Sequence, residues 1–438
     1  MKESPQLLAP YFHCLEHLPS WQSCGRVTKA VGHIVESDGP VCSLGESCEI
    51  ICADGESHTG EIVGFRGKSV LSMPLDRPSG IRYGDKVVAW GERPTLPVGR
   101  GLIGRVIDGT GRPLDDGGAI RAVERRALHA APPQPLERTP IREPLGCGIR
   151  AIDAMLTCGC GQRVGIFGGS GVGKSTLVGM MARGTSADIT VVALVGERGR
   201  EVREFLEDAL GTEGRGRSVV VAATSDQSPL LRMRAALAAT TIAEYFCGEG
   251  KHVLLVVDSL TRFAMAQREI GLAAGEPPTA KGYTPSVFSI LAQLVERTGR
   301  FARGSITAFY SLLMEGDDQQ DPLVDAVRAL LDGHVILERR LAAQNHYPPI
   351  SILDSLSRLM PAVCSPEHLE KVQRLRRLLA SYAASEDLLR VGAYQKNADP
   401  VLDQAIAVMP ALMPFLQQKK DERPLLPETI ARFMGLPG

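Results

Sequence analysis

Residues 168–175 have the types and spacing of a phosphate-binding loop. They fit the pattern GxxxxGK[ST] in full, as Gly168, Gly169, Ser170, Gly171, Val172, Gly173, Lys174 and Ser175. Glycines let the backbone fold around a phosphate with its N–H groups pointing inward, and a helix that starts near Thr176 adds a favourable dipole. We expect Lys174 to reach the β- and γ-phosphates of a nucleotide and the Ser175 hydroxyl to ligate Mg²⁺. The alternative is a glycine-rich turn that arises by chance.

A carboxylate ends an apolar run further along the chain. Residues 253–257 are Val, Leu, Leu, Val and Val, and Asp258 follows them. Such a run is typical of a buried parallel strand, and open α/β sheets bind ligands beyond the C-terminal ends of their strands. Asp258 is therefore the candidate that completes a Mg²⁺ shell. The alternative is a helix cap, because Ser259 and Leu260 come next.

Two glutamates follow a predicted strand at 189–195. The sequence continues as Gly-Glu-Arg-Gly-Arg-Glu, which places Glu197 and Glu201 just beyond that strand. Hydrolysis of a phosphoanhydride needs a group that orients and polarises the attacking water. Either carboxylate suits this role, and the residues alone do not separate the two. A surface charge cluster is the alternative interpretation.

The elements that must position these side chains alternate between apolar runs and longer helical patterns. Strands are predicted at 163–167, 189–195, 218–223, 253–257, 305–312 and 334–337. This alternation indicates an α/β fold, with a parallel sheet covered by helices on both faces. Beyond Pro361 no β-type run occurs, and the pattern predicts helices.

The N-terminal part of the chain has a different pattern. Gly, Asp and Pro turns separate short β-type runs, which predict a small β-barrel and lie at 25–35, 49–52, 60–65, 69–74 and 86–90. Residues 94–150 are rich in Pro and Gly, which is typical of linkers and extended crossings. Residues 1–20 can form either a short amphipathic helix or a frayed terminus.

Composition narrows the class of protein. A chain of 438 residues predicts two or three domains, and 44% hydrophobic with 23% charged residues excludes a mostly disordered chain. The net charge of −1 gives no global basic field of the kind that nucleic-acid-binding proteins usually show. We expect neither a secretory signal nor a membrane span, and ten scattered cysteines suit a reducing cytoplasm. Cys158 and Cys160 are expected to be small buried residues rather than metal ligands.

Several long motifs resemble those of the catalytic subunits of rotary ATPases and their relatives. Among these relatives, the resemblance is to the type III protein export ATPases, and to the flagellar ones before the others. The motifs are GIFGGSGVGKS, ALVGERGRE, LLVVDSLTRFAMAQRE, GEPP, KGY, GSITAFY and EGDDQQDP. The resemblance covers residues 22–438. It implies a RecA-like P-loop NTPase domain with an N-terminal β-barrel and a C-terminal helical domain. The implied division is a regulator-binding helix at 1–21, the barrel at 22–93, the ATPase domain at 94–361 and the helical domain at 362–438.

The resemblance also implies roles for individual residues. It selects Glu197 over Glu201 as the water-polarising carboxylate, with Arg198 beside it as a γ-phosphate or interface contact. Tyr347 matches the aromatic residue that stacks on adenine. Arg358 matches an arginine finger that acts on the ATP of a neighbouring subunit, so the chain is expected to form a ring and to hydrolyse slowly when dilute.

The function implied by the resemblance is hydrolysis of ATP, with Mg²⁺, in a homohexamer that drives protein export. The expected partners are a stator-like regulator at the N-terminus, export chaperone–substrate complexes and the export gate. The expected location is the cytoplasm, at the periphery of an inner-membrane export apparatus. The alternatives are a virulence secretion ATPase, a rotary proton-translocating subunit, an RNA helicase or a non-catalytic subunit. The lack of basic charge argues against nucleic acid as a partner, and Glu197 argues against a non-catalytic subunit.

Overall fold

The structure is a computed structural model that describes residues 23–169, 171–314 and 321–437. These residues divide into two compact units, one formed by 23–94 with 273–275 and the other by 95–272 with 276–437. The predicted N-terminal helix, Ser170 and most of the EGDDQQDP motif lie outside the described residues. Within the described ranges, no helix has the length and apolar character needed to cross a membrane.

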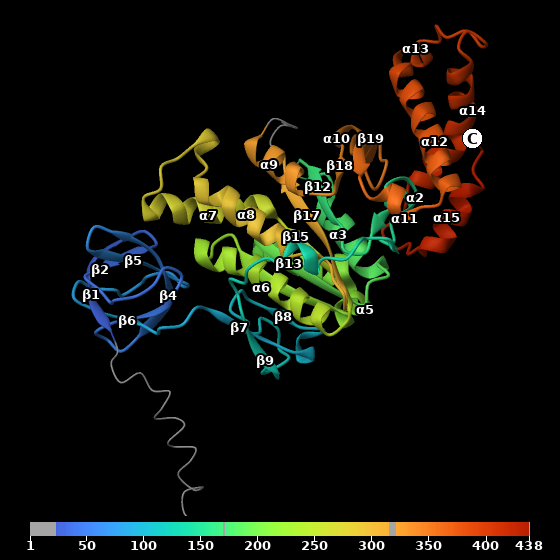
Figure 1. The fold of residues 1–438 in the computed structure, drawn as a ribbon. Coiled ribbons are helices and arrows are strands. Elements are labelled where there is room, and N and C mark those ends of the chain that lie inside the picture. The colour runs from blue at the N-terminus through green and yellow to red at the C-terminus, as the bar shows by residue number, and fades with distance from the viewer. Residues whose placement is uncertain (1–22, 170, 315–320, 438) are drawn as a thin grey trace, which may run out of the picture. The chain divides into compact units, whose positions relative to one another are not determined.

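The first unit contains a closed barrel of six antiparallel strands (Figure 1). The strands are β1 (Cys24–Val31), β2 (Ile34–Ser37), β3 (Ser47–Ile51), β4 (Ser57–Arg66), β5 (Ser69–Pro74) and β6 (Lys86–Ala89). Side chains alternate between the two faces of a strand, so Val27, Val35, Ile50 and Val87 meet in the barrel interior. The predicted barrel is confirmed. The run predicted at 25–35 is in fact two strands, because Gly32 turns the chain with a φ of 58°.

The second unit is built on a nine-stranded sheet. Its strands are β8 (Val106–Ile107), β12 (Arg163–Gly168), β13 (Ile189–Glu197), β14 (Ser218–Thr224), β15 (His252–Asp258), β16 (Gly299–Arg300), β17 (Ser305–Leu313), β18 (Gly333–Leu337) and β19 (Ile350–Ser357). They follow the order β19-β18-β12-β17-β15-β13-β14-β8, with β16 paired to β17. The pairs from β18 to β8 are parallel as predicted, whereas β19 and β16 run antiparallel to their neighbours.

Two small ribbons accompany this sheet. Strand β7 (Thr95–Val98) pairs with β9 (Glu124–Ala127), and β10 (Pro144–Leu145) pairs with β11 (Cys158–Gly159). Residues 94–150, which were predicted to form linkers or extended crossings, therefore carry short strands, and one of them, β8, extends the main sheet. These strands have too few residues to give a periodic pattern in the sequence.

Helices connect the strands of the main sheet. They are α2 (Arg150–Met155), α3 (Lys174–Gly184), α4 (Gly199–Glu204), α5 (Gly211–Gly216), α6 (Pro229–Gly248), α7 (Leu260–Ala274), α8 (Pro285–Glu296), α9 (Pro322–Leu330) and α10 (Arg339–Ala343). Helix α6 packs on β13, β14 and β15. Helix α3 contributes Leu177 and Met181 to a core that also contains Val164 of β12 and Val192 of β13. These contacts fix the start of α3 against the sheet.

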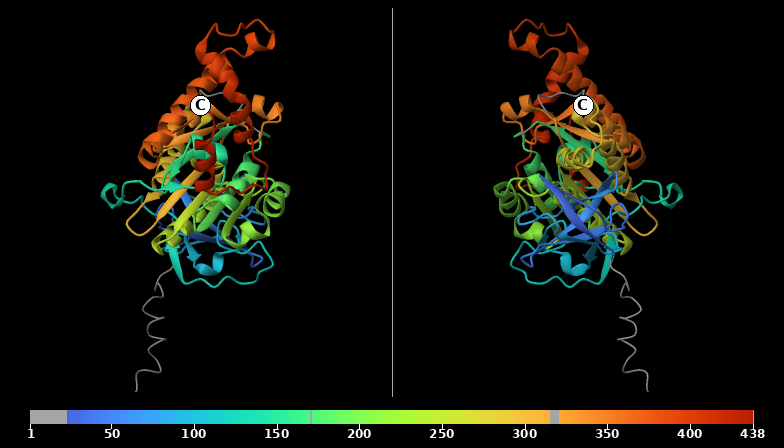
Figure 2. Two further views of the ribbon diagram at one scale, coloured as in Figure 1. Left: turned by 90° about the vertical axis from the view of Figure 1, so that its right-hand side faces the viewer. Right: turned by 90° about the vertical axis from the view of Figure 1, so that its left-hand side faces the viewer.

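The C-terminal region is helical, as predicted. Its helices are α11 (Met360–Val363), α12 (Pro366–Ala384), α13 (Glu386–Arg390), α14 (Pro400–Leu416) and α15 (Leu426–Met434). Helices α12 and α14 pack side by side, and both views of Figure 2 show this orange-to-red pair extending away from the sheet. Near its base, Leu375, Leu412 and Phe433 join the same hydrophobic core as Ile152 of α2.

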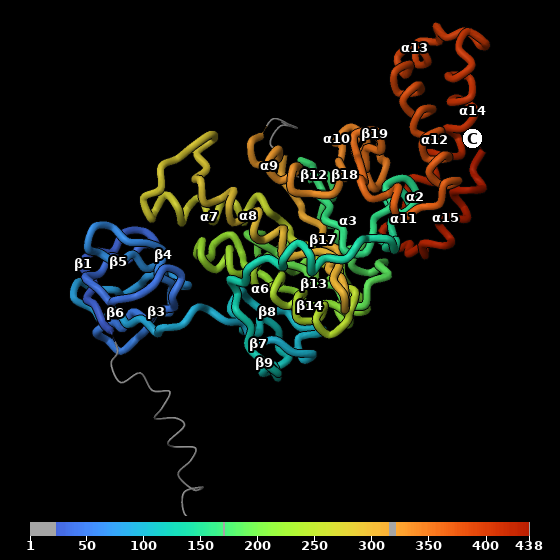
Figure 3. The backbone as a smooth tube through the Cα atoms, in the orientation of Figure 1, coloured from blue at the N-terminus to red at the C-terminus, as the bar shows by residue number. Residues whose placement is uncertain are grey.

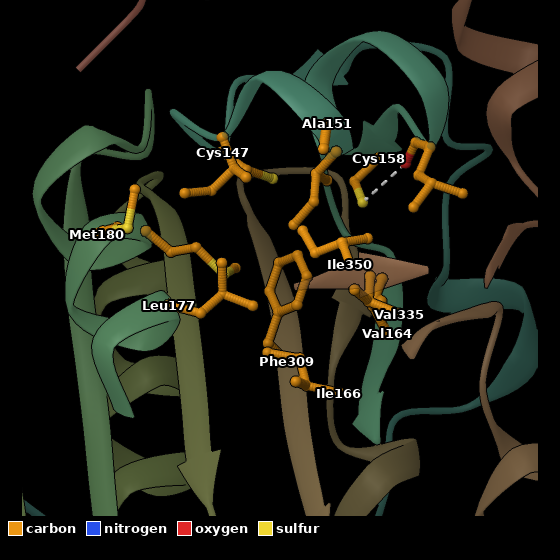
Figure 4. Packing of buried hydrophobic residues seen from close by; sticks show 14 of the residues in the cluster. Cys147, Ala151, Cys158, Val164, Ile166, Leu177, Met180, Phe309, Val335 and Ile350 are labelled. Carbon is orange, nitrogen blue, oxygen red and sulfur yellow. Dashed lines mark hydrogen bonds between the residues drawn. The ribbon is translucent and has the colours of Figure 1, made fainter. Parts of the chain in front are cut away.

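The sulfur atoms of the Cys-x-Cys pair lie in this core. Cys158 is buried near Ile350 and Val335 in Figure 4, and its thiol donates to the carbonyl of Leu156 at 3.5 Å. Cys160 is also buried. In the described ranges, no group of three or more His, Cys, Asp or Glu side chains could hold a metal ion. The expectation that these two cysteines are small core residues agrees with this packing.

Candidate nucleotide-binding site

The phosphate-binding loop joins the end of β12 to the start of α3 (Figure 3). Gly171 and Gly173 have φ angles of 77° and 98°, a backbone region that favours glycine. A Cβ atom at either position would meet no atom within 4 Å, so the space around the loop is open. Val172 between them is buried and anchors the loop to the core. The free amides at the start of α3 can therefore face a bound anion.

Lys174 is the first residue of α3 and is buried. Its Nζ donates to the carbonyl oxygen of Gly168 at 2.8 Å and to that of Gly169 at 3.3 Å. Burial lowers the pKa of Lys174 to about 8, although the nearby carboxylates of Asp258 and Glu197 favour the charged form. A phosphate in the loop would offer this ammonium stronger partners than two carbonyl groups.

Ser175 and Thr176 follow in the first turn of α3, and both are exposed. A Ser175 hydroxyl at a helix N-terminus, next to an open loop, is accessible to a metal ion that also contacts phosphate. Apart from Ser170, the structure brings all the residues predicted to bind phosphate into one loop and one helical turn.

Asp258 ends β15 and is buried at the same edge of the sheet as the loop. It accepts a hydrogen bond of 2.5 Å from the hydroxyl of Ser311 on β17, the strand between β15 and β12. Burial raises the pKa of Asp258, while Ser311 and the charge of Lys174 act against this shift. Mg²⁺ prefers oxygen ligands and is usually held by few protein groups together with phosphate oxygens. The carboxylate of Asp258 and the hydroxyl of Ser175 fit this preference.

Glu197 ends β13, the neighbour of β15. Burial raises the pKa of Glu197 to about 8, and the adjacent carboxyls of Glu201 and Asp258 add to the shift. Glu197 donates a side-chain hydrogen bond to Glu201, which lowers the pKa of Glu201. The two candidates for water activation therefore lie together, and their pKa values are shifted in opposite directions, upward for Glu197 and downward for Glu201. Both carboxyls interact electrostatically with Asp258.

Arg262 on α7 is a site residue that our sequence analysis missed. It interacts electrostatically with Lys174, Glu197 and Asp258. Its Nε atom is buried and has no hydrogen-bond partner among the described residues. A buried, unpaired guanidinium donor beside three site residues suits an anionic ligand. In the sequence it stands four residues after Asp258, within the LLVVDSLTRFAMAQRE motif, on the helix that follows this strand.

Arg198 lies at the edge of this group. Its side chain is 79% exposed, and Nη1 lies 3.7 Å from Glu201 Oε1. Its predicted contact with phosphate or with a neighbouring subunit remains a prediction.

Tyr347 and Arg358 lie at opposite ends of strand β19, and therefore at opposite ends of the strands of the sheet. Tyr347 precedes β19, whose first residue, Ile350, pairs with Leu337 at the edge that carries the loop. Its ring is about half exposed, and its carbonyl accepts from the amide of Gln418 at 2.8 Å. Arg358 follows the last residue of the same strand and is exposed. Eight extended residues span roughly 25 Å, so Arg358 is far from its own phosphate-binding loop.

Comparisons with known families match three parts of the chain. The nucleotide-binding domain of the ATP synthase alpha/beta family matches residues 148–357. The beta-barrel domain of that family matches residues 27–91, and the T3SS EscN ATPase C-terminal domain matches residues 364–435.

Known proteins match over nearly the whole chain. The flagellum-specific ATP synthase of Bacillus subtilis is 50% identical over 97% of this chain and 98% of its own length. That of Salmonella typhimurium is 52% identical over 93% of this chain and 92% of its own. The type 3 secretion system ATPase of Xanthomonas euvesicatoria is 47% identical over 96% of both chains.

A solved structure has the same fold. The assembled ATPase EscN of the enteropathogenic E. coli type III secretion system has a TM-score of 0.89 at 44% identity, over 93% of this chain and 98% of that chain. The order of barrel, nucleotide-binding domain and helical domain predicted from the sequence is confirmed. The chain belongs to the ATP synthase alpha/beta family of P-loop ATPases, on the branch of the flagellar and type III secretion ATPases.

Proposed function

We propose that this chain hydrolyses MgATP to ADP and phosphate within a homohexameric ring and so energises type III protein export, in particular flagellar protein export. The observation that carries the catalytic part is the convergence of Lys174, Asp258 and Glu197 at the C-terminal edge of one sheet. The observation that carries the ring is the position of Arg358 at the other end of the strands, away from the phosphate-binding loop.

Each converging residue has a role that follows from its chemistry. Lys174 exchanges its carbonyl partners for phosphate oxygens, and the amides at the start of α3 donate to the same phosphates. Ser175 and Asp258 hold Mg²⁺, which when bound supplies positive charge to the phosphates. Glu197, as a carboxylate, orients the attacking water and accepts its proton.

Arg358 completes the site of another subunit. A guanidinium must reach the transferred phosphoryl group to stabilise the charge that develops there, an effect worth about 10³–10⁵ in rate. The roughly 25 Å length of β19 keeps Arg358 from the loop of its own chain. The phosphate-binding loop of a second copy can meet this arginine, so the two chains together complete a site that one chain cannot complete alone.

The experiment that tests this proposal mixes two inactive variants. Glu197→Gln is expected to abolish turnover while ATP still binds, and Arg358→Ala is expected to lower turnover in its neighbour. In mixed rings, an interface that combines Glu197 of one chain with Arg358 of the next is complete. ATPase activity above the sum of the separate variants is therefore expected. Arg203→Ala, which removes an exposed arginine of α4, is the matched control and should behave like wild type.

Two outcomes would contradict the proposal. Normal turnover in Glu197→Gln would remove this residue from the mechanism. Absence of any recovery in mixed rings would exclude an arginine that acts between subunits. As a further measurement, Lys174→Ala should weaken equilibrium binding of ATP as well as abolish turnover.

The export system and its partners form a second level of the proposal. Flagellum-specific relatives from two bacteria share 50% and 52% identity with this chain, which supports the flagellar system. EscN has been solved in complex with its central stalk EscO, which supports a ring that binds a stalk-like partner. We propose that residues 1–21 bind a stator-like regulator and that the C-terminal helices meet chaperone–substrate complexes and the export gate. The proposed location is the cytoplasm, next to the inner membrane.

Gene deletion separates the two secretion systems. Loss of flagellar filaments, restored by the wild-type gene but not by the Glu197→Gln form, is the expected result. Intact filaments with loss of virulence-type secretion would instead assign the chain to an injectisome. Deleting residues 1–21 should abolish co-purification of the regulator without lowering ATP binding.

A further inference from the structure

Gln162 contacts the segment that carries Arg358. It immediately precedes β12, and its side chain is fully buried. Its Nε2 donates to the carbonyl oxygen of Asp332 and to Ser357 Oγ, both at 3.1 Å. Its Oε1 accepts from the amide of Gly159 at 2.8 Å. The side chain therefore uses both ends of its amide and has one satisfied orientation.

The carbonyl oxygen of Asp332 has two donors. One is Gln162, and the other is the amide of Arg358 at 2.9 Å. A single oxygen atom thus connects the start of β12 with the backbone of Arg358. The carboxylate of Asp332 is also fixed, because it accepts from the amide and the guanidinium of Arg163, both at 3.1 Å.

Ser357, the residue before Arg358, holds the same stretch of backbone through its hydroxyl. Its hydroxyl accepts from Gln162 and donates to the carbonyl of Thr157 at 2.9 Å. Ser357 is buried, whereas Arg358 directly after it is exposed. The arrangement holds the backbone of Arg358 rigidly and leaves its side chain free to extend.

We infer that Gln162 and Ser357 are positioning residues that hold Arg358 in place for the ATP of the neighbouring subunit. This inference rests on the proposed function of Arg358. Gln162 directly precedes strand β12, and the phosphate-binding loop follows at the other end of this strand. One strand therefore sets the position of the chain's own loop and, through Gln162, that of the arginine offered to the next site.

The test uses Ser357→Ala and Gln162→Met, which remove the hydrogen bonds and nearly preserve the volume. A misplacement of about 1 Å can cost about 10²-fold in rate, so we expect kcat to fall about 10- to 10²-fold. The affinity of each variant for MgATP, measured at equilibrium, should stay within about twofold of wild type, because the chain's own loop is unchanged. Ser357→Thr keeps the hydroxyl and should recover most of the activity.

Mixing with Glu197→Gln subunits gives the readout that a merely structural role would not change. Ser357→Ala subunits have an intact carboxylate, and Glu197→Gln subunits have a well-placed arginine, so mixed rings should exceed the sum of the two. Ser355→Ala is the matched control. This substitution removes a buried hydroxyl of β19 that accepts a hydrogen bond from the amide of Ile336. The Ser355 hydroxyl does not bond Gln162. This control should keep wild-type kcat.

Three results would overturn the inference. The first is wild-type kcat in both Ser357→Ala and Gln162→Met. The second is a loss of activity in Ser357→Ala that mixing does not recover while mixing does recover Arg358→Ala; this result leaves the proposed function intact. The third is no recovery for any variant, including Arg358→Ala, and this result removes the proposed function as well.

Discussion

Ser311 Oγ donates a hydrogen bond of 2.5 Å to Asp258 Oδ1, and both side chains are buried at the edge of the sheet where the phosphate-binding loop begins. This bond commits one oxygen of the carboxylate and leaves the other available to the proposed Mg²⁺ ion. A carboxylate with a fixed orientation binds a hard cation better than one that rotates, as outer partners of metal ligands generally show.

Removal of the Ser311 hydroxyl should weaken metal binding. Loss of an outer-shell partner typically costs about 10–100-fold in metal affinity, so we expect Ser311→Ala to raise the Mg²⁺ concentration for half-maximal ATP binding by about tenfold. The measurement is equilibrium binding of a fluorescent ATP analogue during a Mg²⁺ titration. Binding in EDTA should be unchanged, and Ser311→Thr should behave like wild type. An unaltered Mg²⁺ requirement in Ser311→Ala would show that the bond plays no part in metal binding.

The pH profile of kcat/KM should be bell-shaped with a maximum near pH 8. Burial raises the pKa of Glu197 to about 8, so its active carboxylate form increases as pH rises towards that value. Burial lowers the pKa of Lys174 to about 8, so its ammonium form decreases above it. The profile of kcat/KM reports the free protein, which is the state described here.

Glu201 provides a specific check on the rising limb of that profile. Its carboxylate accepts the proton of Glu197, and its charge opposes ionisation of Glu197. Glu201→Gln should therefore shift the rising limb to lower pH and leave the falling limb in place. A rising limb that does not move would mean that another group controls it.

Tyr347 should contribute to affinity for the base rather than to chemistry. Its ring is about half exposed at the edge that carries the loop, so a face is available for stacking. Stacking of a base on an aromatic ring is worth about 1–3 kcal/mol by alanine substitution. Tyr347→Ala should therefore weaken ATP binding by about that amount and change kcat little, whereas Tyr347→Phe should retain affinity. Equal ATP affinities for wild type and Tyr347→Ala would place the adenine elsewhere.

Arg150 should stabilise the C-terminal segment that supports Tyr347. Its buried guanidinium donates to the carbonyl of Phe415 at 2.9 Å and to that of Gln417, and it pairs with Glu422. Each buried acceptor that loses its donor costs about 1–3 kcal/mol. Arg150→Ala should accelerate amide hydrogen exchange in this segment.

The control for Arg150→Ala is Arg126→Ala, since the Arg126 guanidinium pairs with Glu124 in a more exposed setting. Loss of Arg126 should leave exchange in the C-terminal segment unchanged. Equal protection of that segment in wild type and Arg150→Ala would show that other contacts hold it.

Local pattern was enough to predict much of the fold. Strand β5 begins and ends at the predicted residues, 69 and 74, and the predicted run at 163–167 is one residue shorter than β12. Each of these runs is rich in apolar residues. Strand β19 was missed because three serines and an aspartate interrupt its apolar residues, and because Leu353 and Leu356 are exposed while the serines are buried, against the usual pattern. It forms only as an antiparallel partner at the sheet edge, which is a tertiary effect.

The grouping of the candidate site residues could be predicted where a motif gave each residue its place, although the residues alone did not separate Glu197 from Glu201 and their catalytic roles stay predictions. Lys174, Asp258 and Glu197 each stand at the end of an apolar run or in a glycine-rich loop. Ser311 and Gln162 were missed because a single polar residue in or beside a strand has no periodic signal. Their partners are 53 and up to 195 positions away in the chain, so only the folded sheet reveals them.

Under the proposed role of Arg358, its separation from the phosphate-binding loop of its own chain determines which assemblies can be active. In the proposed ring, the surface that carries Arg358 meets a different surface, the one that carries the loop, so copies join head-to-tail and every subunit faces the same way around the circle. An open arc always retains one unpaired centre, so only cyclic closure lets every copy work.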